Sequence, residues 1–130
     1  MSAPTIPARI DGHRPSLFKP SVIILWATWC GSCVAELRRI PRLQQVAGHL
    51  RIATLAMDPP ERARVVLERE GIDTANAFAD SGQPRAVLAK WGGIMLPLAV
   101  AVDGHGQICG RKRGLLGIDD IKRWALSCSK

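Results

Sequence analysis

The feature that most constrains this chain is a Cys-x-x-Cys pair placed directly after a short apolar run, in the segment SVIILWATWCGSCV at Ser21–Val34. The run Val22–Ala27 is rich in β-branched residues, which is typical of a central strand covered on both faces. Apolar residues recur at helical spacing after the cysteines. The pattern therefore predicts a buried strand, a turn that carries Cys30 and Cys33, and a helix that begins at the pair.

Strand and helix patterns alternate along the rest of the chain, which implies a parallel sheet, and the turn signal DGHG at Asp103–Gly106 adds a closing antiparallel hairpin. Pro41 lies inside the first helical pattern and is expected to kink or break it. Asp58 is expected to cap the helix that follows it. We therefore expect an α/β fold with a central mixed sheet flanked by helices on both faces. The expected elements after the first helix are strands at 51–57, 75–80, 98–102 and 107–113, and helices at 58–71, 84–91 and 118–128.

Length and composition indicate one globular domain. The chain has 130 residues, of which 47% are hydrophobic, and this is enough to bury a core. Residues 1–20 mix Pro, Arg and Gly and are expected to form an irregular arm ahead of a single domain at 21–130. They lack the apolar stretch of a secretory signal, and no segment is apolar for long enough to cross a membrane. The protein is expected either to be cytoplasmic or to have lost a leader or anchor.

The net charge of +7 has two interpretations: attraction to acidic partners or surfaces, or positive charge that is only solvated surface. The basic residues are spread along the chain, and only Arg111–Arg113 forms a cluster. Aromatic residues are few and no nucleic-acid-binding motif is present. We therefore expect no nucleic-acid partner.

The position of the cysteine pair at a helix start predicts thiol–disulfide chemistry. Unpaired backbone N–H groups and the positive end of the helix dipole stabilise a thiolate, so Cys30 is expected to have a lowered pKa and to attack. Cys33, one turn later, is the natural resolving thiol. Gly31 lets a partner's backbone approach, and Ser32 adds a small polar group.

Metal binding and a purely structural disulfide are the alternatives for this pair. A structural zinc site needs four ligands, but the chain has one Cys-x-x-Cys and three isolated histidines. Copper handling through Cys30 and Cys33 stays open. A purely structural disulfide is disfavoured, because a bridge that closes so short a loop removes little chain entropy. The sequence therefore favours a pair that requires no metal and no cofactor, with copper handling as the alternative.

The other two cysteines, Cys109 and Cys128, are expected to be buried, inert free thiols. A bridge between them is the alternative in an oxidising compartment, and only their geometry decides between the two states.

The segment WATWCGSC resembles the active-site segment of the thioredoxin superfamily, and more narrowly that of bacterial TlpA, ResA and DsbE-type thiol–disulfide oxidoreductases. The segment IMLPLAVAVDGHGQI, with Pro97, is similar to the family's cis-proline segment and the hairpin after it. Pro97 lies 67 positions after Cys30, as in the branch with an extra helix and strand, here at 58–80. The resemblance covers about Ser21 to the end of the chain. It implies a thioredoxin-like fold.

The resemblance also implies how partners are positioned. Pro97 would be cis and lie against the cysteine pair, and the backbone of Leu96 would pair with an extended partner peptide. Trp26 and Trp29 would cover the disulfide and form part of the docking surface, where Gly31 and Ser32 also lie.

The function implied is a thiol–disulfide oxidoreductase of the protein-disulfide reductase type, acting as a monomer through the Cys30/Cys33 pair. Its partners would be protein dithiols or disulfides, such as those of cytochrome c biogenesis, and an upstream thiol–disulfide electron donor. Its place would be the periplasm, either free or tethered to the membrane. The alternative is a thioredoxin-fold module that handles copper or zinc, or binds a partner, without turnover.

The sequence departs from the family pattern in three places. The two residues between the cysteines are Gly-Ser, without the proline that usually precedes the second cysteine. These interior residues tune the redox potential of the pair. Ile24 stands where thioredoxin has a buried acid, for which Glu36 or water would have to substitute. Pro41 lies three residues after the usual position of the kink proline, which is occupied here by Arg38.

Overall fold

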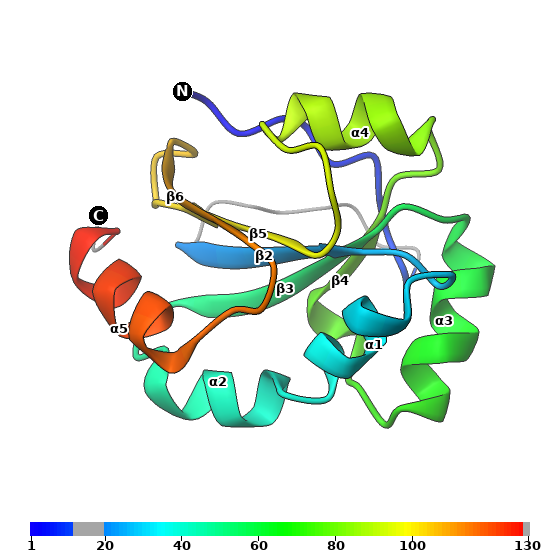
Figure 1. Cartoon of the computed structure of the whole chain (residues 1–130), viewed down its shortest axis with the longest axis horizontal. Helices are drawn as coiled ribbons and strands as arrows, with labels where there is room; N and C mark the ends of the chain where they lie inside the picture. Colours follow the sequence, from blue (N-terminus) through cyan, green and yellow to red (C-terminus); the bar gives the residue numbers. More distant parts are fainter. Residues whose placement is uncertain (12–19, 129–130) are drawn as a thin grey trace.

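The computed structural model describes residues 1–11 and 20–128, and a mixed sheet with the strand order β1-β4-β3-β2-β5-β6 forms its centre (Figure 1). Strand β2 (Ser21–Trp26) is central, as predicted. It pairs in parallel with β3 (Arg51–Ala56) and antiparallel with β5 (Leu98–Val102). The other elements are β1 (Ala8–Arg9), α1 (Gly31–Leu37), α2 (Ile40–Val46), α3 (Pro60–Arg69), the 3-10 helix η1 (Thr74–Asn76), β4 (Ala77–Ala79), α4 (Pro84–Lys90), β6 (Ile108–Arg113) and α5 (Ile118–Ser127).

The predicted α/β class and mixed sheet are confirmed. Strand β4 pairs in parallel with β3, whereas β5 and β6 form the antiparallel hairpin that the turn signal predicted. The predicted insert is also present, because α3, η1 and β4 lie between β3 and α4 in the chain.

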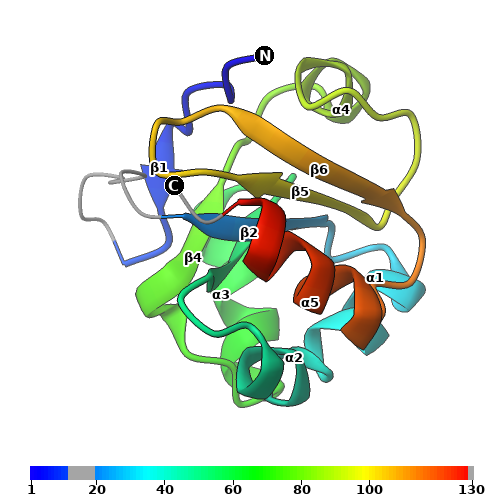
Figure 2. The same cartoon turned by 90° about the vertical axis from the view of Figure 1, so that its left-hand side faces the viewer.

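Helices cover both faces of the sheet, as expected (Figures 1 and 2). The alternation of side chains along β2 explains this arrangement, because successive residues of a strand point to opposite faces. Ile23 and Leu25 pack in a cluster with α4, whereas Val22 and Ile24 pack with α2 and α5. Trp26 continues the second face and packs with residues of α1 and α3. A strand buried on both faces holds its carboxyl end rigidly, and this end carries the cysteine pair.

The first helical pattern is broken, as Pro41 predicted. Helix α1 ends at Leu37 and α2 begins at Ile40, with Pro41 in the first turn of α2. A proline lacks the N–H that a continuous helix needs, but this N–H is unpaired anyway in a first turn.

The beginning of the chain differs from the expected irregular arm. Ala8–Arg9 form β1, which pairs antiparallel with β4 and covers its otherwise open edge. Ile6 and Ile10 are buried in the core. Two isoleucines and an available strand edge explain why this part of the arm is ordered. Residues 12–19 of the arm lie outside the described residues, and its separation from a domain at 21–130 stays a prediction.

No helix within residues 1–11 and 20–128 is both long and apolar enough to cross a membrane.

Candidate active site

Cys30 and Cys33 lie where β2 ends and α1 begins. Cys30 is the N-cap residue of α1, and its Sγ accepts a hydrogen bond from the backbone N–H of Cys33 at 3.3 Å. The two cysteines form a disulfide, with their Cα atoms 5.2 Å apart. The predicted strand–turn–helix placement of the pair is therefore confirmed.

The two sulfur-bearing side chains differ in exposure. Cys30 is half-buried, whereas Cys33 is completely buried and packs in a cluster with Trp26 and Leu37. A thiolate partner from outside can therefore approach Cys30 but not Cys33. The hydroxyl of Ser32, an exposed residue, lies 3.5 Å from the Cys30 Sγ. A side chain at Gly31 would extend into open space, so the surface over the pair is open to an approaching backbone.

Asp58 anchors the loop that precedes the cysteines. Its buried carboxylate accepts hydrogen bonds from the backbone N–H of Thr28 at 2.8 Å and from the Thr28 hydroxyl at 3.0 Å. The prediction that Asp58 caps the next helix was wrong: Pro59 is the N-cap residue of α3 and no side chain caps this end. Asp58 instead accepts hydrogen bonds from Thr28, because the carboxyl ends of the parallel strands β2 and β3 meet at one sheet edge.

Sequence reasoning missed this role of Asp58. The signal for it was the position of an acidic residue directly after a buried strand that is parallel to β2. Without the strand order, nothing in the sequence connects Asp58 to a residue thirty positions earlier.

The Leu96–Pro97 peptide bond is cis, as the family resemblance implied. Pro97 is buried, and its carbonyl accepts a hydrogen bond from the Gly114 N–H at 3.0 Å. Leu96 is half-buried and packs against the cluster that contains Cys30 and Cys33. No backbone hydrogen bond from another described residue engages Leu96. Its backbone groups are therefore available for an additional strand beside the cysteine pair.

Exposed apolar side chains surround this segment. Trp29 is 63% exposed and directly precedes Cys30. Ile94 and Met95 are exposed directly before Leu96, and Leu115 is exposed directly after the glycine that binds Pro97. Surface patches of this kind mark sites of protein contact.

The expectation that Trp26 contributes to the docking surface was wrong. Its side chain is fully buried beneath the site, because β2 is covered on this face by α1 and α3. Trp26 therefore supports the cysteine pair from below, whereas Trp29 lies at the surface.

Glu36 does not replace the acid missing at Ile24. Ile24 is completely buried, and Glu36, the suggested substitute, is engaged elsewhere. The Glu36 carboxylate accepts hydrogen bonds from the Leu116 N–H at 2.8 Å and from Arg39 at 3.4 Å, and none joins it to Cys33 among the described residues. Burial raises the pKa of Glu36, although the Leu116 N–H and the Arg39 guanidinium oppose the shift. Glu36 therefore ties α1 to the loop before α5.

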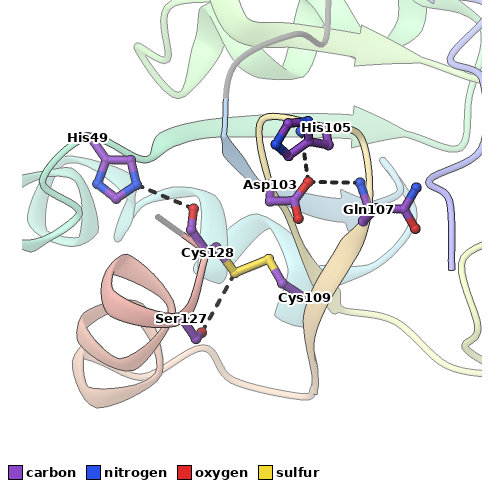
Figure 3. Close-up of a disulfide and its surroundings, with 7 residues drawn as sticks. All are labelled: His49, Asp103, His105, Gln107, Cys109, Ser127 and Cys128. Atoms are coloured by element: carbon purple, nitrogen blue, oxygen red, sulfur yellow. Dashed lines mark hydrogen bonds between the residues drawn. A yellow bond between two sulfur atoms is a disulfide. The ribbon is translucent and has the colours of Figure 1, made fainter. Parts of the chain in front are cut away.

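Cys109 and Cys128 form a second disulfide, so the expectation of two free thiols was wrong (Figure 3). The bridge joins β6 to α5, and its Cα atoms are 5.9 Å apart, within the usual range for disulfides. Packing of α5 against the sheet brings the two residues together, which their spacing in the sequence did not indicate. Cys128 is completely buried, and its carbonyl lies 3.4 Å from the His49 Nε2.

A cavity of about 440 Å³ lies between the α1–α2 break and the segment after α3, but neither cysteine lines it. Within the described part of the chain, no three His, Cys, Asp or Glu side chains gather in a way that could hold a metal ion. The candidate site is a disulfide that is accessible only at Cys30 and that has exposed apolar side chains near it in the sequence.

A curated protein is similar in sequence to most of this chain. Thiol:disulfide interchange protein HelX from Rhodobacter capsulatus is 29% identical over 105 residues, which cover 81% of this chain. The chain spans 58% of the length of that relative. No family model matches the chain.

Solved structures share the fold. MTB dsbF has a TM-score of 0.71 and 24% identity, with 95% of this chain and 99% of the other covered. A thiol:disulfide interchange protein of the thioredoxin family from Chlorobium tepidum TLS has a TM-score of 0.71 and 18% identity, with 99% and 96% covered. StoA from Bacillus subtilis has a TM-score of 0.70 and 16% identity, with 92% and 94% covered. These likenesses show that the chain has the fold of the thioredoxin-family thiol:disulfide interchange proteins, with a Cys-x-x-Cys at the start of α1 and a cis-proline at Pro97.

Proposed function

We propose that this protein is a thiol–disulfide oxidoreductase that exchanges electrons with protein partners through Cys30 and Cys33. The observation that carries this proposal is the difference in exposure within one disulfide. A half-buried sulfur at a helix start is paired with a completely buried one. Only Cys30 is accessible to a partner, so Cys30 attacks and Cys33 resolves the mixed disulfide.

The surroundings of Cys30 support its role as nucleophile. The backbone N–H of Cys33 points at the Cys30 Sγ and would stabilise the thiolate after reduction of the pair. Asp58 holds Thr28, and through it the loop before Cys30, in a fixed conformation. In the forward reaction the Cys30 thiolate attacks one sulfur of a partner disulfide and expels the other as a thiolate. The Cys33 thiolate then attacks the Cys30 sulfur, which releases the reduced partner and restores the Cys30–Cys33 bond.

The partner-binding surface is proposed to comprise Trp29, Gly31, Ser32, Leu96 and Pro97. The unengaged backbone of Leu96 would pair with an extended segment of the partner, a common way of recognising peptides at a strand edge. Trp29 would cover an apolar part of that segment.

We further propose that the protein works in an oxidising compartment, facing the periplasm. The Cys109–Cys128 bridge supports this, because stable structural disulfides persist in oxidising environments. The direction proposed is reduction of partner disulfides, including those of cytochrome c biogenesis, with electrons from an upstream thiol–disulfide protein. The protein is proposed to act as a monomer.

The test is to trap the mixed disulfide. Cys33→Ser removes the resolving thiol, so a partner with a reducible disulfide, such as insulin, should remain linked through Cys30. Cys30→Ser should form no such adduct, since Cys33 is buried. The matched control replaces Cys109 and Cys128 with alanine and leaves the active pair intact.

Turnover is measured in parallel, as insulin reduction in the presence of dithiothreitol. Wild type and the control variant should reduce insulin, whereas neither serine variant should. Absence of both turnover and adduct would refute the proposal. If, in addition, Cu(I) or Zn²⁺ bound tightly to wild type but not to the Cys30/Cys33 double variant, the metal-handling alternative would take its place. The reduction potential of the Cys30/Cys33 pair, compared with the compartment, decides the direction.

A further inference from the structure

A basic groove lies beside the cis-proline segment. Its volume is about 310 Å³, and it is lined by Gly92, Gly93, Ile94, Leu98, Arg111 and Arg113. Both charged residues in its lining are arginines from β6, and no acidic residue lines it among the described part of the chain. The groove therefore favours an anionic occupant.

Two glycines make room for this groove. A Cβ atom at Gly92 would lie 2.6 Å from the Arg111 Nε, and the backbone φ of Gly92 is +81°. A Cβ atom at Gly93 would lie 2.5 Å from a methyl carbon of Leu98. Any larger residue at either position would displace the groove wall. The Arg111 Nε also donates a hydrogen bond to the Trp91 carbonyl at 2.9 Å, which fixes the guanidinium against this backbone.

The two arginines are not neutralised by the rest of the described structure. Arg111 contacts the Met1 sulfur at 3.2 Å, and no carboxylate of residues 1–11 and 20–128 forms an ion pair with Arg111 or Arg113. By contrast, Lys112 between them lies 3.6 Å from Asp120 on the other face of the sheet. Side chains alternate along β6, so Arg111 and Arg113 share one face, and neither has a counter-ion in the part of the chain that the structure describes.

The groove is close to the position proposed for the partner strand. Ile94, in its wall, precedes Leu96 by two residues, a span of at most about 7 Å. Arg113 directly precedes Gly114, whose N–H binds the Pro97 carbonyl. An extended peptide that pairs with Leu96 would therefore reach the groove roughly two to four residues from its own cysteine.

We propose that this groove selects partners that carry an Asp or Glu close to the reacting cysteine. This inference rests on the proposed function and names the class of partner for the same site. The planar guanidinium of Arg113 suits a carboxylate, which it can bind through two parallel hydrogen bonds. Complementary charge raises the association rate most strongly at low ionic strength. A preference of roughly two- to fivefold in kcat/KM is expected, because Arg113 is exposed and pairs of exposed charges contribute little.

The experiment uses three disulfide-linked peptides that differ only at a position three residues from the cysteine, which is Glu, Gln or Lys. Their rates of reduction by the dithiol form of the full chain are measured by stopped-flow fluorescence at low and high salt. Wild type should reduce the Glu peptide faster, and the difference should shrink at high salt. Arg113→Gln should abolish the preference, and Arg113→Glu should reverse it toward a Lys peptide. Lys122→Gln, with the same charge change on α5, is the matched control and should keep the preference.

Equal rates for the Glu and Gln peptides in wild type would overturn this inference while leaving the proposed function intact. A preference that survives in Arg113→Gln, or disappears equally in Lys122→Gln, would also overturn it, because net charge rather than the groove would then be responsible. Absence of exchange with every peptide would overturn the proposed function and this inference with it.

Discussion

The Cys109–Cys128 disulfide should be the main covalent contribution to the stability of this fold. It closes a loop of 19 residues between β6 and α5. The chain-entropy relation for a loop of this length gives about 3 kcal/mol at 25 °C. With an unfolding entropy of roughly 2 cal/mol/K per residue over 130 residues, this corresponds to a decrease in Tm of roughly 10 °C when the bridge is lost. The Cys30–Cys33 bridge spans only three positions, so the same relation gives about half that free energy.

The assay is urea unfolding followed by tryptophan fluorescence. The double variant Cys109→Ala, Cys128→Ala should lose about 3 kcal/mol relative to oxidised wild type. Alanine also removes a sulfur from the core at Cys128, so wild type with both disulfides reduced is the matched reference with unchanged side chains. It should be destabilised by a similar amount relative to wild type in which only the Cys30/Cys33 pair is reduced. If bridged and reduced wild type unfold at the same urea concentration, the reasoning from loop closure is refuted.

Three further predictions concern Asp58 and Glu36 near the site and Gly110 in β6. Asp58→Ala should destabilise the protein by about 2 kcal/mol and slow insulin reduction, because the Thr28 N–H loses its acceptor, whereas Asp58→Asn should restore most of both. Urea unfolding and turnover check this, and full activity in Asp58→Ala would contradict it. Since burial raises the folded-state pKa of Glu36 above 4.5, stability from its protonated form is complete below that pH and is lost as the pH rises through the folded pKa. Glu36→Gln should therefore gain stability relative to wild type in unfolding experiments as the pH rises, and a constant difference would argue against this. Gly110→Ala should reduce the free energy of unfolding by about 1–3 kcal/mol and so lower Tm, because its Cβ would lie 2.3 Å from the Trp124 Nε1. An unchanged Tm would contradict this and would mean that the Trp124 ring moves freely.

Local patterns in the sequence were sufficient for most of the secondary structure. The β-branched run of β2, the proline in the first turn of α2 and the turn signal between β5 and β6 each act through contacts within a few residues. The position of the redox pair could be predicted in the same way, because a Cys-x-x-Cys between a strand and a helix is a local pattern. The cis state of Pro97 was expected from the family resemblance and not from spacing or composition.

Contacts between distant segments depended on the tertiary structure. Asp58 binds Thr28 because β2 and β3 are parallel neighbours in register, and Cys109 reaches Cys128 because α5 packs against the sheet next to β6. Strand β1 forms because β4 leaves an open edge.

The sequence by itself determined the order of the elements, the position of the cysteine pair and the burial of the strand beneath it. Only the tertiary structure decided what lies around that pair: the Asp58 anchor, the buried Trp26, and, among the described residues, a Leu96 backbone without a hydrogen-bond partner and β6 arginines without a counter-ion. The physical reason is that periodicity depends on neighbouring residues, whereas strand order, register and helix packing depend on the whole chain.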